Sequence, residues 1–150
     1  MAELRDLYQE TVLDHYKKPR NYRRLAHANR QANGHNPLCG DKLSVFIQIE
    51  DGVVQDISFI GTGCAISTAS ASMMTESLKG KTESQAKAIY ERFQQLVTNN
   101  SEPPVHPEAL GQLTVFSGVR EYPVRAKCAI LAWHTLRAAL EGTKETVETE

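Results

Sequence analysis

Residues 35–52, HNPLCGDKLSVFIQIEDG, decide the fold and also raise the question of a functional site. Every second residue from Leu43 to Ile49 is apolar, a period of two that predicts a strand with one buried face. Asp51-Gly52 then predicts a two-residue hairpin turn, and residues 53–59 supply the antiparallel return strand. Cys39 lies in a Pro- and Gly-flanked turn just ahead of the first strand.

The flanking sequence predicts an α+β fold in one domain, residues 1–150, with a small antiparallel sheet of about three strands. The third strand is assigned to residues 28–36. Thr82 and Gln85 match a capping box, which places a helix start between them. Gly142 is expected to end the last helix, and the tail 143–150 is expected to fray. The predicted helices cover residues 2–17, 64 to about 80, 82 to about 97, and 123 to about 141.

Composition excludes several classes of function. The 150 residues carry 17 basic and 18 acidic side chains, a net charge of -1 that predicts neither nucleic-acid nor membrane-surface binding. We find no apolar run of about 20 residues and no signal-peptide pattern, so we expect a cytoplasmic protein without membrane contact. Three cysteines cannot form a complete set of disulfides, and thiols in reducing cytosol are more often metal ligands or reactive groups.

The three cysteines all fall at ends of predicted elements, where loops bring distant residues together. Cys39 precedes a strand, while Cys64 and Cys128 fall near helix N-termini, whose partial positive charge favours thiolates. With Asp41 they form a set of three sulfurs and one oxygen, which is compatible with tetrahedral zinc. The alternative is that the cysteines are small core residues, because free cysteine is among the most buried residue types. The sequence has no C-x-x-C pair, which would have favoured metal binding.

Histidines add one reserve ligand to this set. His35 lies near Cys39, and imidazole has a general affinity for zinc. His15 is expected to face the surface or to cap the first helix. His106 is placed in a loop and His134 on a helix face.

Four segments together resemble the IscU/SufU family of iron–sulfur cluster assembly proteins: LYQETVLDHYKKPRN (7–21), NPLCGD (36–41), GTGCAISTASASMM (61–74) and PVRAKCAILAW (123–133). The resemblance implies a small antiparallel sheet with helices on one face. It implies a site made of Cys39, Asp41, Cys64 and Cys128, which would bind Zn2+, iron or a transient iron–sulfur cluster. It also implies a SufS-like cysteine desulfurase as partner, with iron–sulfur acceptor or carrier proteins downstream.

Within that family the sequence is most similar to the SufU-like branch. IscU-like members carry histidine before the last cysteine, whereas this chain has Lys127, whose reference pKa of about 10.4 makes it a poor neutral ligand. Residues 94–116 resemble a SufU-like insertion, and Arg125 belongs to the SufU-like pattern PVRAKC.

The resemblance leaves two functions open. In the first, Cys39 accepts persulfide sulfur at a zinc site, and Arg125 assists by pairing with Asp41. In the second, the same ligands hold a nascent iron–sulfur cluster on a non-enzymatic scaffold. A zinc domain used only for protein contact is a third reading, which the loop position of Cys39 disfavours.

Overall fold

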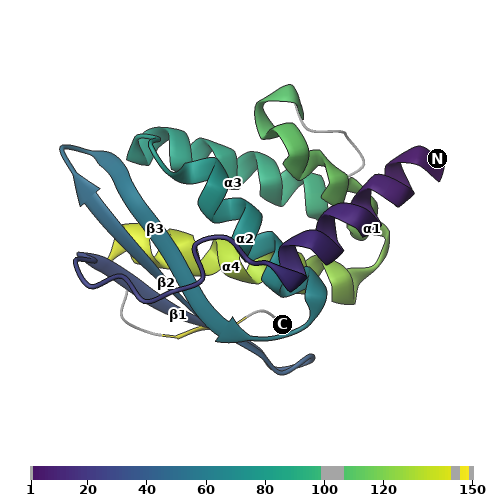
Figure 1. The fold of residues 1–150 in the computed structure, drawn as a ribbon, viewed down its shortest axis with the longest axis horizontal. Coiled ribbons are helices and arrows are strands. Elements are labelled where there is room, and N and C mark those ends of the chain that lie inside the picture. Colours follow the sequence, from purple (N-terminus) through teal and green to yellow (C-terminus); the bar gives the residue numbers. More distant parts are fainter. Residues whose placement is uncertain (1, 99–106, 143–145, 149–150) are drawn as a thin grey trace.

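The computed structural model describes residues 2–98, 107–142 and 146–148. The chain forms an α+β structure in which helices gather on one side of a small sheet (Figure 1). In chain order, the elements are α1 (Ala2–Lys17), β1 (Arg30–Asn36), β2 (Asp41–Glu50), β3 (Val53–Thr62), α2 (Ala65–Leu78), α3 (Glu83–Val97), the 3₁₀ segment η1 (Pro107–Glu121), α4 (Pro123–Glu141) and β4 (Val147–Glu148).

The sheet has the strand order β3-β2-β1-β4 and is mixed. The three predicted strands are antiparallel neighbours, as expected. The prediction that the tail frays is wrong for residues 147–148, which form β4 and pair in parallel with Gly34 and His35 of β1. The edge of β1 offers unpaired backbone groups, and a short strand there satisfies some of them.

The register of the β2–β3 hairpin determines where Asp41 lies. Asp51 and Gly52 both have positive φ, 53° and 73°, as the predicted tight turn requires. From that turn the register runs back to Lys42 opposite Thr62. The first residue of β2, Asp41, therefore lies beside the chain as it leaves β3 toward α2.

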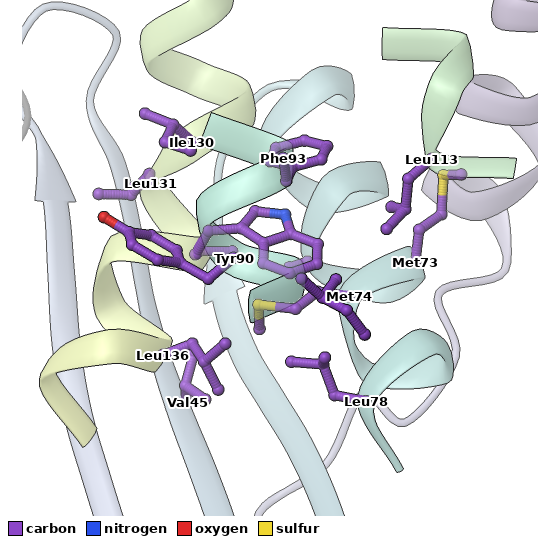
Figure 2. Packing of buried hydrophobic residues seen from close by; sticks show 14 of the residues in the cluster. Val45, Met73, Met74, Leu78, Tyr90, Phe93, Leu113, Ile130, Leu131 and Leu136 are labelled. Carbon is purple, nitrogen blue, oxygen red and sulfur yellow. The ribbon is translucent and has the colours of Figure 1, made fainter. Parts of the chain in front are cut away.

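The core fills the space between the sheet and the helices. α4 packs on β1 and β2, and α2 packs against β3 and α4. At the centre, the rings of Phe93 and Trp133 are stacked with their centroids 4.6 Å apart. Figure 2 shows the methionines of α2 and Leu136 of α4 around this centre. The small-residue stripe 70–74 is thus tight packing, as its composition indicates.

α1 is tied to α2 by a buried histidine, so the prediction of a surface-facing His15 is wrong. Its side chain is buried, with Nδ1 2.7 Å from the Ser72 hydroxyl and Nε2 3.6 Å from Glu76. Burial lowers the pKa of His15, which keeps the ring neutral and leaves one nitrogen free to accept a hydrogen bond.

The segment after α3 contains structure that the sequence pattern did not predict. η1 covers residues within and beyond the supposed insertion, with a kink at Gly111 (φ 56°). Leu113 and Phe116 from η1 are fully buried, so apolar burial holds together a segment with poor helical periodicity. His106 lies outside the described residues. None of the helices in the described ranges has both the length and the apolar character that a membrane crossing requires.

Packing of β1 on α4 depends on the absence of a side chain at Gly34. A Cβ there would collide with the Thr135 hydroxyl and lie 3.2 Å from Leu131. We expect Gly34→Ala to lower the free energy of unfolding by about 1–3 kcal/mol, the usual cost of overpacking. Gly118→Ala is the control, because its Cβ would meet no atom within 4 Å. Equal urea midpoints for the two variants would contradict the close approach.

Candidate metal centre

Four predicted ligands meet at one end of the sheet, each brought by a different part of the backbone. Cys39 and Asp41 come from the β1–β2 loop and the start of β2, Cys64 caps α2, and Cys128 lies in α4. Ligand atoms of Cys39, Asp41 and Cys128 all lie within 4.8 Å of one another. Cys64 Sγ borders this group, 3.9 Å from Asp41 Oδ2, but it is not within 4.8 Å of all three of the other ligand atoms.

Asp41 is the shared centre of this group and is fully buried. Its Oδ1 accepts a hydrogen bond from the Cys64 backbone N–H at 2.9 Å, at the start of α2. Its Oδ2 faces the Asn36 amide at 3.4 Å and the Cys64 thiol. A buried carboxylate needs such donors, and a helix N-terminus favours its charge. Asp41 therefore holds the loop, the strand and the helix together.

Cys64 is the thiol best suited to being a thiolate. It is the N-cap of α2, and its Sγ accepts from the Ser67 backbone N–H at 3.4 Å. A hydrogen bond with Cys128 and those from backbone N–H groups lower the pKa of Cys64 to about 7, against the opposing effect of partial burial. The backbone N–H groups at the helix N-terminus thus contribute to this shift in the predicted direction, after the hydrogen bond with Cys128.

The same prediction is wrong for Cys128. Cys128 lies five residues after Pro123, beyond the first turn of α4, where the N-terminal effect has faded. It is buried, with Sγ 3.4 Å from Cys39 Sγ. Its hydrogen bond with Cys64, its burial and its contact with Cys39 all raise its pKa. The hydrogen bond shared by the two thiols therefore lowers the pKa of Cys64 and raises that of Cys128.

Cys39 is the exposed member of the set. It lies in the turn between β1 and β2, where its backbone N–H and that of Gly40 both bond to the Asn36 carbonyl. Gly40 has φ 72°, a conformation that favours glycine. The loop thus presents Cys39 toward solvent while its other end, Asp41, is buried.

Gly63 allows the chain to pass directly beside Asp41. A Cβ at this position would lie 2.8 Å from Asp41 Oδ1 and 3.2 Å from Asp41 Cβ. The absence of a side chain at this position therefore permits the close approach of the backbone to the carboxylate. Gly61, with φ 154°, is confined by Lys42 and Leu43 of the neighbouring strand.

Two other predicted participants have different neighbours. Arg125 lies over the ring of Tyr122, 4.6 Å from its centroid, and within the described ranges it forms no ion pair with Asp41. Its place one turn before Cys128, on an exposed part of α4, explains why it does not reach the buried carboxylate. His35 is a half-buried β1 residue paired with Lys42 and is not in the gathered group.

Two residues near the centre were missed from the sequence. Asn36 is fully buried and donates to Asp41 and, at 3.7 Å, to Cys128 Sγ. Its Asn-Pro dipeptide, a turn signal, was the available clue. The hydroxyl of Tyr8 is buried without a partner among the described residues. Burial raises the pKa of Tyr8; the charge of Arg125 opposes this effect, and negative charge on the nearby thiols would add to it.

Comparison with known proteins gives consistent matches over most of the chain. The family model for the NifU-like N terminal domain matches residues 7–129. The iron-sulfur cluster assembly scaffold protein IscU of Streptococcus pyogenes serotype M1 is 37% identical over 94% of this chain and 87% of its own. The zinc-dependent sulfurtransferase SufU of Bacillus subtilis (strain 168) is 36% identical over 90% of each chain. The crystal structure of FiSufU from Fervidobacterium islandicum AW-1 is 30% identical, with a TM-score of 0.82 over 89% of this chain and 96% of that chain.

The proton distribution between Cys64 and Cys128 can be measured by alkylation of metal-free protein. We expect the iodoacetamide reaction at Cys64 to reach half its maximal rate near pH 7, because its pKa is lowered to about 7. Cys128 should stay unmodified through this range, because it is buried and protonated. Peptide mass spectrometry distinguishes the sites. In urea all three thiols should titrate near their usual value of about 8.5, and the same value for Cys64 in folded protein would contradict the assignment.

Proposed function

This chain belongs to the family of NifU-like N-terminal domains, and on that premise we propose that it accepts persulfide sulfur from a cysteine desulfurase for iron–sulfur cluster assembly. The family resemblance inferred from the sequence is thus confirmed. The observation that carries the proposal is the gathering of three thiols and a buried carboxylate at one end of the sheet, with one thiol exposed.

The donor set fits zinc. Two sulfurs bound to one tetrahedral zinc at about 2.3 Å would be about 3.8 Å apart, close to the 3.4 Å between Cys39 and Cys128. The 3.9 Å between Cys64 Sγ and Asp41 Oδ2 is also within the range for two ligands of one ion. Cys39, Asp41 and Cys128 are close enough together to hold the ion, and Cys64, beside Asp41, would be the fourth ligand. When bound, zinc would keep the thiolates deprotonated without itself being oxidised or reduced.

Cys39 is assigned as the acceptor on grounds of access. Its Sγ lies in an exposed turn, whereas Cys128 is buried and Cys64 is intermediate. The Cys39 thiolate attacks the outer sulfur of the desulfurase persulfide and forms a new S–S bond. The original S–S bond breaks, and its electron pair leaves on the desulfurase cysteine. One sulfur is transferred as a persulfide on Cys39, with no net change in oxidation state.

The remaining ligands act as a fixed frame. Cys64 is held by the first turn of α2, Cys128 by α4, and Asp41 by the Cys64 N–H. Because these three are at least partly buried, a partner protein can approach Cys39 without displacing them. Arg125 is exposed and lies over the Tyr122 ring, so its positive charge would act on a docked partner protein and not on Asp41.

Lys127 supports the sulfur-acceptor function over the scaffold function. It replaces the histidine expected of IscU-like members next to Cys128, so a nitrogen ligand is missing from that place. The scaffold alternative, in which an iron–sulfur cluster is the cargo of the same side chains, is supported by the relative named IscU at nearly the same identity as SufU. Single-turnover assays separate the two, since only the first yields a persulfide on this chain before iron is added.

The three free thiols also suit a reducing compartment. We therefore place the reaction in the cytoplasm, with a SufS-like desulfurase as donor and an iron–sulfur acceptor or carrier protein as recipient.

Zinc-loaded protein and a desulfurase charged with one equivalent of cysteine test the acceptor assignment. Cys39→Ala should abolish sulfur transfer and leave the thermal melt of the metal-free protein unchanged, because the side chain is exposed. Cys64→Ala should mainly weaken zinc retention, because it removes the cap of α2 and a fixed ligand. Intact-protein mass spectrometry followed by peptide mapping locates the added 32 Da of one sulfur atom. Its recovery on Cys64 or Cys128 would overturn the assignment.

The carboxylate ligand is expected to make metal exchange fast. Oxygen is a poorer partner than thiolate in a sulfur-rich zinc site, so Asp41→Cys should retain zinc longer and turn over sulfur more slowly. The off-rate is measured by mixing with excess chromophoric chelator in a stopped-flow instrument. Asp56→Cys is the matched control, because Asp56 lies on β3 and pairs with Arg23 away from the centre. Equal off-rates for native and Asp41→Cys protein would show that the carboxylate does not govern exchange.

A further inference from the structure

Asn36 occupies a position between the exposed and the buried parts of the centre. It ends β1, is fully buried, and is five residues from Asp41 in sequence. Its backbone carbonyl accepts from the N–H groups of Cys39 at 3.3 Å and Gly40 at 2.8 Å. One residue thus fixes the backbone of the turn that carries the exposed thiol.

The Asn36 side chain makes two different kinds of contact. Its Oδ1 accepts from the Leu38 backbone N–H at 3.2 Å, which closes an Asx turn over Pro37. Its Nδ2 is 3.4 Å from Asp41 Oδ2 and 3.7 Å from Cys128 Sγ. An amide nitrogen carries two hydrogens, so one can point to each acceptor.

The orientation of this amide follows from its partners. The Leu38 N–H can only donate, so it requires the amide oxygen, and the nitrogen must then face the carboxylate and the sulfur. The reversed amide would place its oxygen against Asp41 Oδ2, two acceptors in a buried space, which is costly.

We propose that Asn36 is a positioning residue that holds the Cys39 turn in place and, through its two amide hydrogens, supports the negative charge of Cys128 and Asp41. The inference rests on the proposed function, because it assumes that these side chains ligate a metal. Three thiolates and one carboxylate carry more negative charge than a divalent ion neutralises, so donors next to the ligands stabilise the set. Removing an outer hydrogen-bond partner of this kind typically lowers metal affinity by about 10–100-fold.

Two substitutions separate the turn from the amide donor. Asn36→Asp keeps an oxygen for the Leu38 N–H but places a carboxylate against Asp41 and Cys128. Asn36→Ser also keeps a turn acceptor, adds no charge, and is too short to reach Cys128. Asn33→Asp is the matched control for charge, because Asn33 lies exposed on the same strand and bonds to Ser44 instead.

Cobalt(II) serves as the probe, because its thiolate complexes absorb and its affinity can be measured by chelator competition. We expect native and Asn33→Asp protein to bind cobalt equally. Asn36→Asp and Asn36→Ser should lose about 10–100-fold in affinity, Asp more than Ser, with an altered cobalt–thiolate absorption band. The band reports the ligand set, which includes Cys39 on the turn. Asn36→Ser keeps an acceptor for the turn, so a changed band or affinity in that variant reports loss of the amide donor and not loss of the turn. Circular dichroism of the metal-free proteins checks folding, and if Asn36→Asp does not fold, Asn36→Ser decides.

The outcomes distinguish the inference from the function on which it rests. Failure of the native protein to show a cobalt–thiolate band would overturn the metal centre and the role of Asn36 with it. A band in the native protein that persists with equal position and affinity in the folded Asn36 variants would overturn only the role of Asn36.

Discussion

The hydrogen bond from the Cys64 backbone N–H to Asp41 Oδ1 is the constraint on which the rest of the site depends. A fully buried carboxylate is tolerated only where donors or a cation offset its loss of hydration. Here the N-terminus of α2 provides the donor, and Gly63 is required because any side chain would push the carboxylate away. The bond joins the strand that starts at Asp41 to the helix that starts after Cys64, and so fixes two ligands relative to each other.

Hydrogen bonding and exposure give the three thiols different properties, although all three are cysteines in one small space. The hydrogen bond between Cys64 and Cys128 lowers the pKa of Cys64 and raises that of Cys128; the N–H groups at the start of α2 add to the first effect and burial adds to the second. Cys39 is exposed in a turn whose backbone is fixed by Asn36. The proposed function, in which one site holds a metal and meets a partner protein, would require this combination of fixed and accessible sulfurs.

The strands and the hairpin could be predicted because each depends on local sequence. The four candidate ligands were proposed from their places at element ends and from the family resemblance. Alternation identified β2, and Asp51-Gly52 identified the turn. What could not be predicted depends on contacts distant in sequence. The burial of His15 against Ser72, the pairing of β4 with β1, and the amide of Asn36 at Cys128 all join segments that no local pattern links. The expected pairing of Arg125 with Asp41 is absent, because the Arg125 side chain lies over the Tyr122 ring on α4.

The spacing between the two helix-borne thiols is set by the core and does not require a metal. Ser70 of α2 donates to the Ala129 carbonyl of α4 at 2.6 Å and accepts from the Trp133 ring nitrogen at 3.1 Å. These buried bonds lie within two turns of Cys64 and next to Cys128, so they hold the two helices in register at the site. In zinc-finger peptides the metal supplies on the order of 10 kcal/mol because no other core exists. Here the packing around Trp133 already orders the candidate ligands, so less of the binding energy of a metal would be spent on folding and more would appear as affinity. Loss of the metal would then leave the turn that carries Cys39 attached to helices and strands that are still folded.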